Sequence, residues 1–238
     1  MSNNYFQFKQ FTVQQEKCAM KVCTDACLFG AWVAECMKEQ QPASILDIGT
    51  GTGLLALMLA QKTTAAIEAV EIEQDAFLQA GENFEASEWK ERLQVNHTDI
   101  SRFGPEKKYD LIISNPPFFE DDLKSLQQNK NAAKHDSTLT LLALLEKAKA
   151  LLHEQGMFAV LLPHHRTAYF TGLCEQKGLF CKVQAMVKQT PAHAYFRSML
   201  LFTFNQTASN EQVITIKDEH GKYSKAFTDL LKDYYLYL

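Results

Sequence analysis

The stretch of sequence that decides the fold is Asp47-Ile48-Gly49-Thr50-Gly51-Thr52-Gly53. A short apolar run, residues 44–48, overlaps its start, and a second apolar run, residues 54–61, follows it. A buried strand, a glycine-rich turn and a helix in this order are typical of α/β proteins in which the helix N-terminus faces a bound ligand. The spacing is GxGxG and not the GxGxxG of dinucleotide-binding proteins. The sequence therefore predicts a ligand-binding loop of a different type.

Apolar runs alternate with helix-like stretches along most of the chain. We expect helices at 26–38, 54–61, 74–87, 139–155 and 167–177, and strands at 44–48, 65–73, 93–97, 109–114, 157–162, 181–188 and 199–205. Gly156 is expected to end the helix before it, because glycine is common just past a helix C-terminus. This alternation predicts an α/β fold with a mostly parallel sheet and helices on both faces. The two consecutive strands near the end predict an antiparallel pair.

The composition is that of an ordinary globular protein, with 46% of the 238 residues hydrophobic and 22% charged. We predict a single domain, with an N-terminal extension at 1–40, a core at 41–205 and a C-terminal appendage at 206–238. No apolar run reaches the roughly 18 residues of a membrane-spanning helix. The N-terminus lacks the features of a secretory signal, so we expect a cytoplasmic protein. Six cysteines without CxxC spacing favour free thiols over a metal site.

The net charge of −4 argues against a protein that coats nucleic acid, but not against an enzyme that acts on it. Basic residues do form three local clusters, which are Lys124, Lys130 and Lys134; His164, His165 and Arg166; and Lys217, Lys222 and Lys225. Each cluster is either a solvated face or a contact to phosphate groups.

The tetrad Asn115-Pro116-Pro117-Phe118 follows the strand expected at 109–114, at the sheet edge where open α/β folds bind ligands. The Asn115 side-chain oxygen and the Pro116 carbonyl can each accept a hydrogen bond from a planar amine, which favours positive charge on its nitrogen. The two prolines stiffen that carbonyl, and Phe118 offers a face on which a base can stack. The tetrad predicts catalysis at an exocyclic amine. The alternative is that the prolines only end a strand and that Phe118 is part of the core.

Two acidic residues follow strands at positions suited to a nucleoside cofactor. Glu71 ends the second strand, where a carboxylate can accept both ribose hydroxyls, and Glu73 is an alternative on the same face. Asp99 follows the third strand and can accept an adenine amino group, or it caps the next turn. With these residues and Asn115 we assign to cofactor binding Asp47, Gly49, Gly51, Gly53, Ile72 and Ile100.

Taken together, the motifs resemble the class I methyltransferases, and closely the bacterial tRNA1(Val) (adenine(37)-N6)-methyltransferase family. The resemblance covers nearly the whole chain and includes residues 8–11, 20–32, 46–53, 115–119, 133–135, 156–158 and 161–163. The loop and the tetrad are shared by many amino-methyltransferases. The segment from Lys21 to Trp32 discriminates better, because relatives that modify glutamine or guanine usually carry other N-terminal domains.

The resemblance implies S-adenosylmethionine as cofactor, a tRNA substrate, and a Rossmann-like sheet of seven strands with one antiparallel strand. From the cysteine pattern we expect no metal. The resemblance places Lys21, Thr24 and Asp25 near the methionine end of the cofactor. To the RNA it assigns Phe119, Lys124, Lys130, Lys134, His135 and Arg197. Lys134 stands where this family is expected to have arginine, which keeps the positive charge but loses bidentate contact with phosphate. A monomer is favoured.

Three functions compete at this point. The first is N6-methylation of an adenine in tRNA, beside the anticodon of tRNA(Val). The second is methylation of a protein glutamine amide, or of rRNA or DNA, on the same Asn-Pro-Pro platform. Enzymes of the glutamine type usually have tyrosine where this chain has Phe118, and a separate helical N-terminal domain. The third is a catalytically idle cofactor-binding scaffold, against which the intact tetrad argues.

Overall fold

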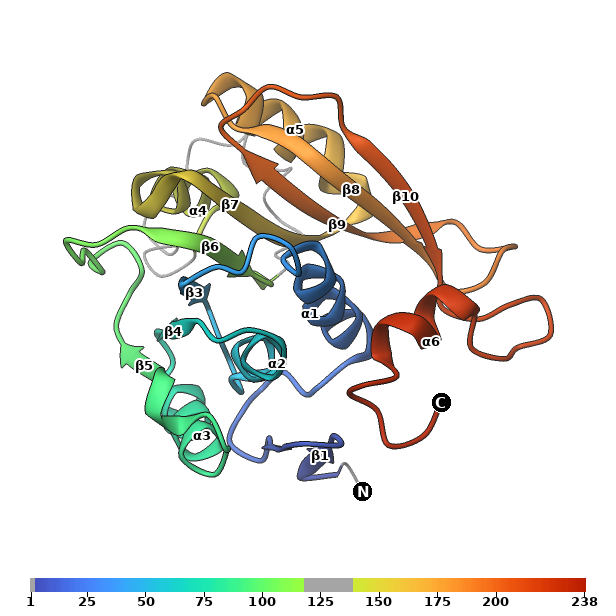
Figure 1. The fold of residues 1–238 in the computed structure, drawn as a ribbon, viewed down its shortest axis with the longest axis horizontal. Helices are drawn as coiled ribbons and strands as arrows, with labels where there is room; N and C mark the ends of the chain where they lie inside the picture. The colour runs from blue at the N-terminus through green and yellow to red at the C-terminus, as the bar shows by residue number, and fades with distance from the viewer. Residues whose placement is uncertain (1–2, 118–138) are drawn as a thin grey trace, which may run out of the picture.

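A computed structural model of the protein describes residues 3–117 and 139–238. The described residues contain an eight-stranded sheet with the order β10-β8-β9-β7-β6-β3-β4-β5. Figure 1 shows this sheet fanning from β10 at one edge to β5 at the other. Its strands are β3 (Ser44–Ile48), β4 (Ala66–Glu71), β5 (Leu93–His97), β6 (Tyr109–Ser114), β7 (Leu152–Pro163), β8 (Phe180–Lys188), β9 (Tyr195–Thr203) and β10 (Asn210–Thr215).

The fold class predicted from the sequence is confirmed, including its one reversed strand. Among the described strands of this sheet only β9 runs against its neighbours, β7 and β8. The expected count of seven strands is wrong, because β10 adds an eighth, parallel to β8. β10 comes from the segment expected to be an appendage, and it pairs with backbone groups that β8 would otherwise leave open at a sheet edge.

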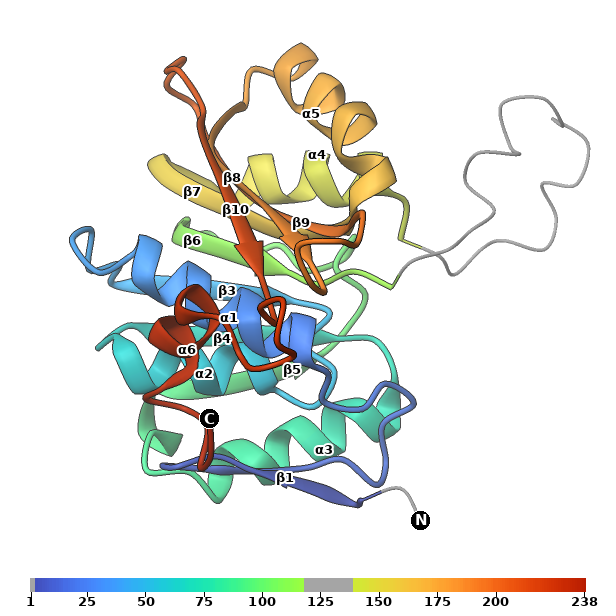
Figure 2. The same ribbon diagram turned by 90° about the vertical axis from the view of Figure 1, so that its right-hand side faces the viewer.

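Helices cover both faces of the sheet, as Figures 1 and 2 show. One face is covered by α1 (Thr24–Cys36), α2 (Leu54–Lys62), α3 (Gln74–Glu85) and α6 (Lys225–Leu231), and the other by α4 (Leu141–Leu151) and α5 (Thr167–Gln176). Every residue of α2 from Leu54 to Ala60 is buried, since this helix lies between α1 and the sheet. No helix within 3–117 or 139–238 has the length and apolar character needed to cross a membrane.

The helix expected at 139–155 ends earlier than its sequence pattern indicates. α4 ends at Leu151 and β7 begins at Leu152, so Gly156 lies inside a strand and does not stop a helix. A Cβ atom at this position would lie 2.8 Å from the Tyr109 carbonyl oxygen. Glycine is needed here because the backbones of β6 and β7 approach each other closely beside a register shift.

The first residues of the chain form a small hairpin of β1 (Tyr5–Gln7) and β2 (Thr12–Gln14). The hairpin lies beside the last residues of the chain, as both ribbon views show. Phe8 forms an antiparallel bridge with Tyr235, and the Lys9 amide donates to the Tyr234 carbonyl at 2.8 Å. The two ends of the chain are thereby tied into one layer that supports α2 and α3.

Candidate functional site

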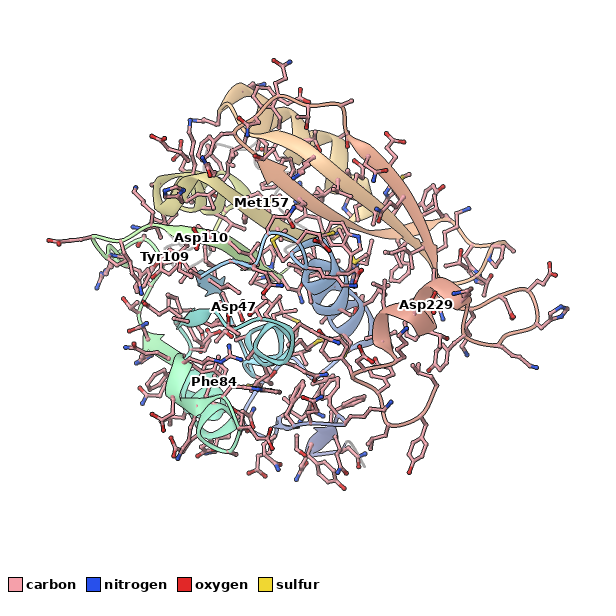
Figure 3. The ribbon with its side chains drawn as sticks, in the orientation of Figure 1. Asp47, Phe84, Tyr109, Asp110, Met157 and Asp229 are labelled. Carbon is pink, nitrogen blue, oxygen red and sulfur yellow. The ribbon has the colours of Figure 1, made fainter. Side chains whose placement is uncertain are left out.

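The glycine-rich loop between β3 and α2 has the backbone that its sequence requires. Gly49, Gly51 and Gly53 have φ angles of +71°, +57° and +82°, which side chains other than glycine rarely adopt. A Cβ at Gly49 or Gly51 would meet no atom within 4 Å, so open space lies over that part of the loop. At Gly53 a Cβ would come within 2.5 Å of Phe84 on α3, which Figure 3 labels. The loop is therefore packed against α3 at its end and open at its start.

Asp47, which Figure 3 labels near the middle of the fold, is the charged group nearest the start of the loop. Its side chain is completely buried, and its Oδ2 accepts a hydrogen bond from the Thr50 hydroxyl at 2.6 Å. Its Oδ1 has no hydrogen-bond partner among the described residues. Burial raises the pKa of this carboxyl to about 7. Asp47 can therefore carry a proton near neutral pH.

Glu71 is fixed against the same loop. One carboxylate oxygen accepts from the Gly51 amide at 2.8 Å, and the other accepts from the amides of Ile72 and Glu73 at 2.8 and 2.9 Å. Glu71 is 7% exposed, whereas the Glu73 side chain faces solvent just before α3. The structure thus brings Glu71 to the loop and leaves the competing Glu73 outside it.

Asp99 caps the turn that follows β5. Its Oδ1 accepts from the Ser101 amide at 2.8 Å, which is the alternative role that the sequence left open. Ile100 is buried in the core beneath this turn, and the Ile72 side chain is exposed. A contact between Asp99 and a cofactor stays a prediction.

The tetrad begins where β6 ends, directly beside the loop. Ser114 is in register with Ile48 of β3, and its hydroxyl donates to the Ile48 carbonyl at 2.8 Å. Adjacent strands lie about 5 Å apart, so Asn115 and Gly49 leave the sheet side by side. The Asn115 Oδ1 atom is buried without a partner among the described residues, and Pro116 is buried next to it.

An ion pair connects the start of α1 to β9. Arg197 of β9 donates from Nε to an Asp25 carboxylate oxygen at 2.7 Å, although the two residues are 172 positions apart. Burial alone would raise the pKa of Asp25, but hydrogen bonds with Cys23 and Arg197 lower it below its usual value. A residue assigned to the cofactor and one assigned to RNA are therefore partners. Thr24 begins α1 and is exposed.

Lys21, the third residue assigned to the methionine end of the cofactor, contacts the N-terminal segment. Its ammonium donates to the Gln15 carbonyl at 2.7 Å, and the Gln15 side chain in turn accepts from the Val22 amide at 2.8 Å. The hairpin thus positions the approach to α1.

The predicted catalytic and RNA-contacting residues that lie outside the described residues are Phe118, Phe119, Lys124, Lys130, Lys134 and His135. In the described ranges no group of three or more His, Cys, Asp or Glu residues is arranged to hold a metal ion.

One site residue was not predicted from the sequence: Asn83 of α3, which binds the backbone of the glycine-rich loop. Asn83 is 1% exposed, and its amide group donates to the Thr52 carbonyl at 2.8 Å. The same side chain donates to the Gln14 carbonyl and accepts from the Gln14 amide, both at 2.9 Å. A signal was present, since Gln79 and Asn83 are polar residues four positions apart on the apolar face of α3. Buried amides on such a face need specific partners.

Comparison with known proteins places this geometry in a family. Residues 30–190 match the family model described as Methyltransferase small domain. A Parabacteroides distasonis protein named tRNA1(Val) (adenine(37)-N6)-methyltransferase is 41% identical over 99% of each chain. A Flavobacterium johnsoniae protein of the same name is 43% identical over 97% of this chain and 99% of the relative. The chain belongs to this family.

Solved structures share the fold of this methyltransferase. A predicted O-methyltransferase from Agrobacterium tumefaciens aligns with a TM-score of 0.66 at 16% identity, over 88% of this chain and 96% of that one. TrmN from Thermus thermophilus aligns with a TM-score of 0.53 at 23% identity, over 73% of this chain and 47% of that one. These likenesses confirm the class I methyltransferase fold.

The residues of this methyltransferase fit S-adenosylmethionine, and membership of the family confirms that cofactor. Open space lies over Gly49 and Gly51, at the N-terminal side of α2, where amide groups suit a carboxylate. Glu71 supplies buried carboxylate oxygens at the end of β4, the usual place for a ribose contact. Two buried oxygens, on Asp47 and Asn115, have no partner among the described residues.

Proposed function

We propose that this protein methylates N6 of an adenine in tRNA, the adenine next to the anticodon of tRNA(Val). The observation that carries the proposal is near-complete coverage, at 41% and 43% identity, of relatives with that name. The site supports it independently, because an amide oxygen without a described partner lies beside the cofactor loop on Asn115, at the end of β6.

The residues of the loop hold the cofactor in this scheme. S-adenosylmethionine, when bound, supplies a methyl group activated by its sulfonium sulfur. Gly49 and Gly51 allow close approach of its amino-acid portion to the backbone, and Glu71 accepts hydrogen bonds from its ribose. Asp47 holds the start of the loop through its hydrogen bond with Thr50.

The residues of the tetrad act on the adenine. Asn115 Oδ1 and the Pro116 carbonyl accept the two N–H bonds of the exocyclic amine, which orients the nitrogen and favours the positive charge that it gains. Phe118 provides the stacking face for the base. No general base is required in this scheme, because the proton leaves after the nitrogen has become cationic.

We also propose that the chain works as one domain, as a monomer, in the cytoplasm. β10 extends the same sheet that carries the loop and the tetrad, and α6 packs on α1, so the last segment is part of the same body. tRNA is a cytoplasmic substrate. Light scattering of the purified protein tests the monomer.

The test is incubation of the protein with methyl-labelled S-adenosylmethionine and either bulk tRNA from a strain without this activity or release-factor protein. We expect label in tRNA, recovered as N6-methyladenosine by nucleoside mass spectrometry. Label in the protein substrate alone would establish the glutamine reaction in its place. Label in neither would favour an idle scaffold.

A further inference from the structure

A second surface lies on the same sheet edge as the tetrad, on the side away from the cofactor loop. His164 follows β7 directly, Lys188 ends β8 and Tyr195 begins β9. Lys188 and Tyr195 are register partners across β8 and β9. The order β6-β7-β9-β8 and a strand spacing of about 5 Å place all three strand ends within about 15 Å of β6. We call these three residues the Tyr195 surface.

The side chains of the Tyr195 surface contact one another. The rings of His164 and Tyr195 lie 5.0 Å apart and are tilted by 51°, and the Lys188 ammonium lies 4.6 Å from the centre of the Tyr195 ring. All three side chains are half-buried, so each keeps part of its surface in solvent. Aromatic rings beside a cation are the combination that binds single-stranded nucleic acid, through base stacking and phosphate contact.

His164 is held in a defined orientation. Its Nδ1 forms a 2.9 Å hydrogen bond with the Ser198 hydroxyl, which also accepts from the Thr167 hydroxyl at 2.8 Å. Ser198 is fully buried in β9. A solvated surface histidine does not need buried partners of this kind, and a ring that must present one face to a ligand gains from them.

A cavity of about 410 Å³ opens beside this ring, in the size range of small-ligand sites. Its lining includes His164, His165, Thr167, Thr171, Glu175 and Gln184. The Thr171 hydroxyl is buried and has no hydrogen-bond partner among the described residues. The cavity therefore offers two imidazole rings, hydroxyl and amide groups, and one carboxylate, which suit the polar edge of a base.

The charges on this half of the edge favour an anion. Lys188 supplies a positive charge here, and His164, His165 and His193 supply ring N–H groups that can donate to an anion. Against them stand Asp25, which is paired with Arg197, and Glu175 in the cavity. On the cofactor half the side chains that follow the strands are acidic, as with Glu71, Glu73, Asp75 and Asp99. A polyanion that reaches the tetrad therefore meets fewer acidic side chains on the β7-β9-β8 side than on the cofactor side.

We propose that the Tyr195 surface binds a nucleotide that flanks the target adenine in the RNA substrate. Tyr195 and His164 contact its base, and Lys188 contacts phosphate. The proposal rests on the proposed function, because it names where the RNA of that reaction lies.

The experiment measures methylation of an unmodified tRNA transcript by the full-length protein, with separate titrations of cofactor and of tRNA. Tyr195→Ala should raise KM for tRNA about tenfold and leave kcat and cofactor affinity within twofold of wild type. Tyr195→Phe should restore KM. His164→Asn, which keeps a polar group for Ser198 but removes the ring, should also raise KM. In a plot of the logarithm of tRNA affinity against the logarithm of salt concentration, Lys188→Gln should make the slope shallower by about 0.7–0.9.

Matched controls lie elsewhere on the molecule. Tyr237→Ala changes an exposed tyrosine near the end of the chain, and Lys38→Gln an exposed lysine just past α1; neither should alter KM for tRNA. Cofactor affinity and thermal unfolding show whether each variant is folded.

The outcomes separate this proposal from the function on which it rests. A wild-type protein that does not methylate tRNA overturns both. Wild-type methylation together with unchanged KM in Tyr195→Ala and His164→Asn overturns the Tyr195 surface alone. If Tyr195→Ala does not fold, His164→Asn and Lys188→Gln decide the matter.

Discussion

The two halves of the sheet edge that carries the site are built in opposite ways. On the β3-β4-β5 half, the groups that face a ligand are backbone amides, buried carboxylates and glycines with positive φ. On the β7-β9-β8 half they are half-exposed rings and cations. A small cofactor needs fixed, desolvated contacts, whereas a flexible polyanion is held by charge and stacking. The tetrad lies between the halves and depends on both.

The largest loss of activity is expected for a change in the tetrad, which lies between the two halves of the edge. Asn115→Ala should lower kcat about 100- to 1000-fold, because it removes one of two acceptors that stabilise the charged amine. Affinities for cofactor and for tRNA should stay within twofold, since each is set by one half of the edge. Single-turnover methylation and equilibrium titration measure the two quantities. A variant with normal kcat would show that the tetrad is only a strand end.

Asp47, on the cofactor half, should also make the unfolding free energy depend on pH. Burial raises the pKa of Asp47 to about 7, from about 3.9 in an unfolded chain. Between these values the folded protein retains a proton that the unfolded chain has lost, so this contribution to stability is present at low pH and lost as pH rises through 7. Asp47→Asn should shrink the fall in unfolding free energy from pH 5 to pH 8 by about 2–3 kcal/mol. Urea denaturation at both pH values tests this, and an unchanged fall would contradict it.

Loss of Asn83, which binds the loop from α3, should lower the unfolding free energy somewhat less. Asn83→Ala leaves the Thr52 carbonyl and both backbone groups of Gln14 without their partner, so we expect a loss of about 2 kcal/mol in unfolding free energy and weaker cofactor binding. Asn96→Ala is the control, because Asn96 makes a single long contact of 3.4 Å. Equal stability of the two variants would remove Asn83 from the site.

The smallest expected effect, on cofactor affinity, best distinguishes the roles of the two halves. Glu71→Gln should weaken cofactor binding about tenfold, or 1.4 kcal/mol, without changing tRNA affinity. Glu73→Gln, at the exposed neighbour, should change neither. Tyr195→Ala is expected to have the opposite pattern, with weaker tRNA binding and unchanged cofactor affinity. A loss of tRNA affinity in Glu71→Gln would show that the two halves do not have separate roles.

Local patterns were enough to predict the strands nearest the site. The bounds of β3, β5 and β6 agree with the strands expected at 44–48, 93–97 and 109–114, because turn residues flank each of them; β3 and β6 are also mostly buried. The loop and Asn115 follow these strands, so their shared edge could be predicted as well.

Contacts between distant segments could not be predicted in this way. The pair of Asp25 and Arg197 spans 172 positions, and Asn83 meets Gln14 across 69. The pairing of β10 with β8 depends on an open edge that exists only once the sheet has formed. The helix end expected at Gly156 is wrong because glycine is favoured both where two strands approach closely and just past a helix C-terminus.

The tie between the two ends of the chain has a consequence for biosynthesis. Lys9 bonds to Lys232, which is 223 positions later, and Phe8 pairs with Tyr235. At about 5–20 residues per second on the ribosome, roughly 10–45 s separate the emergence of these partners. Through that interval the rings of Phe6 and Phe8 lack their contacts with the Tyr235 ring. The N-terminal layer of this methyltransferase therefore forms only after the segment around residues 232–235 has left the ribosome.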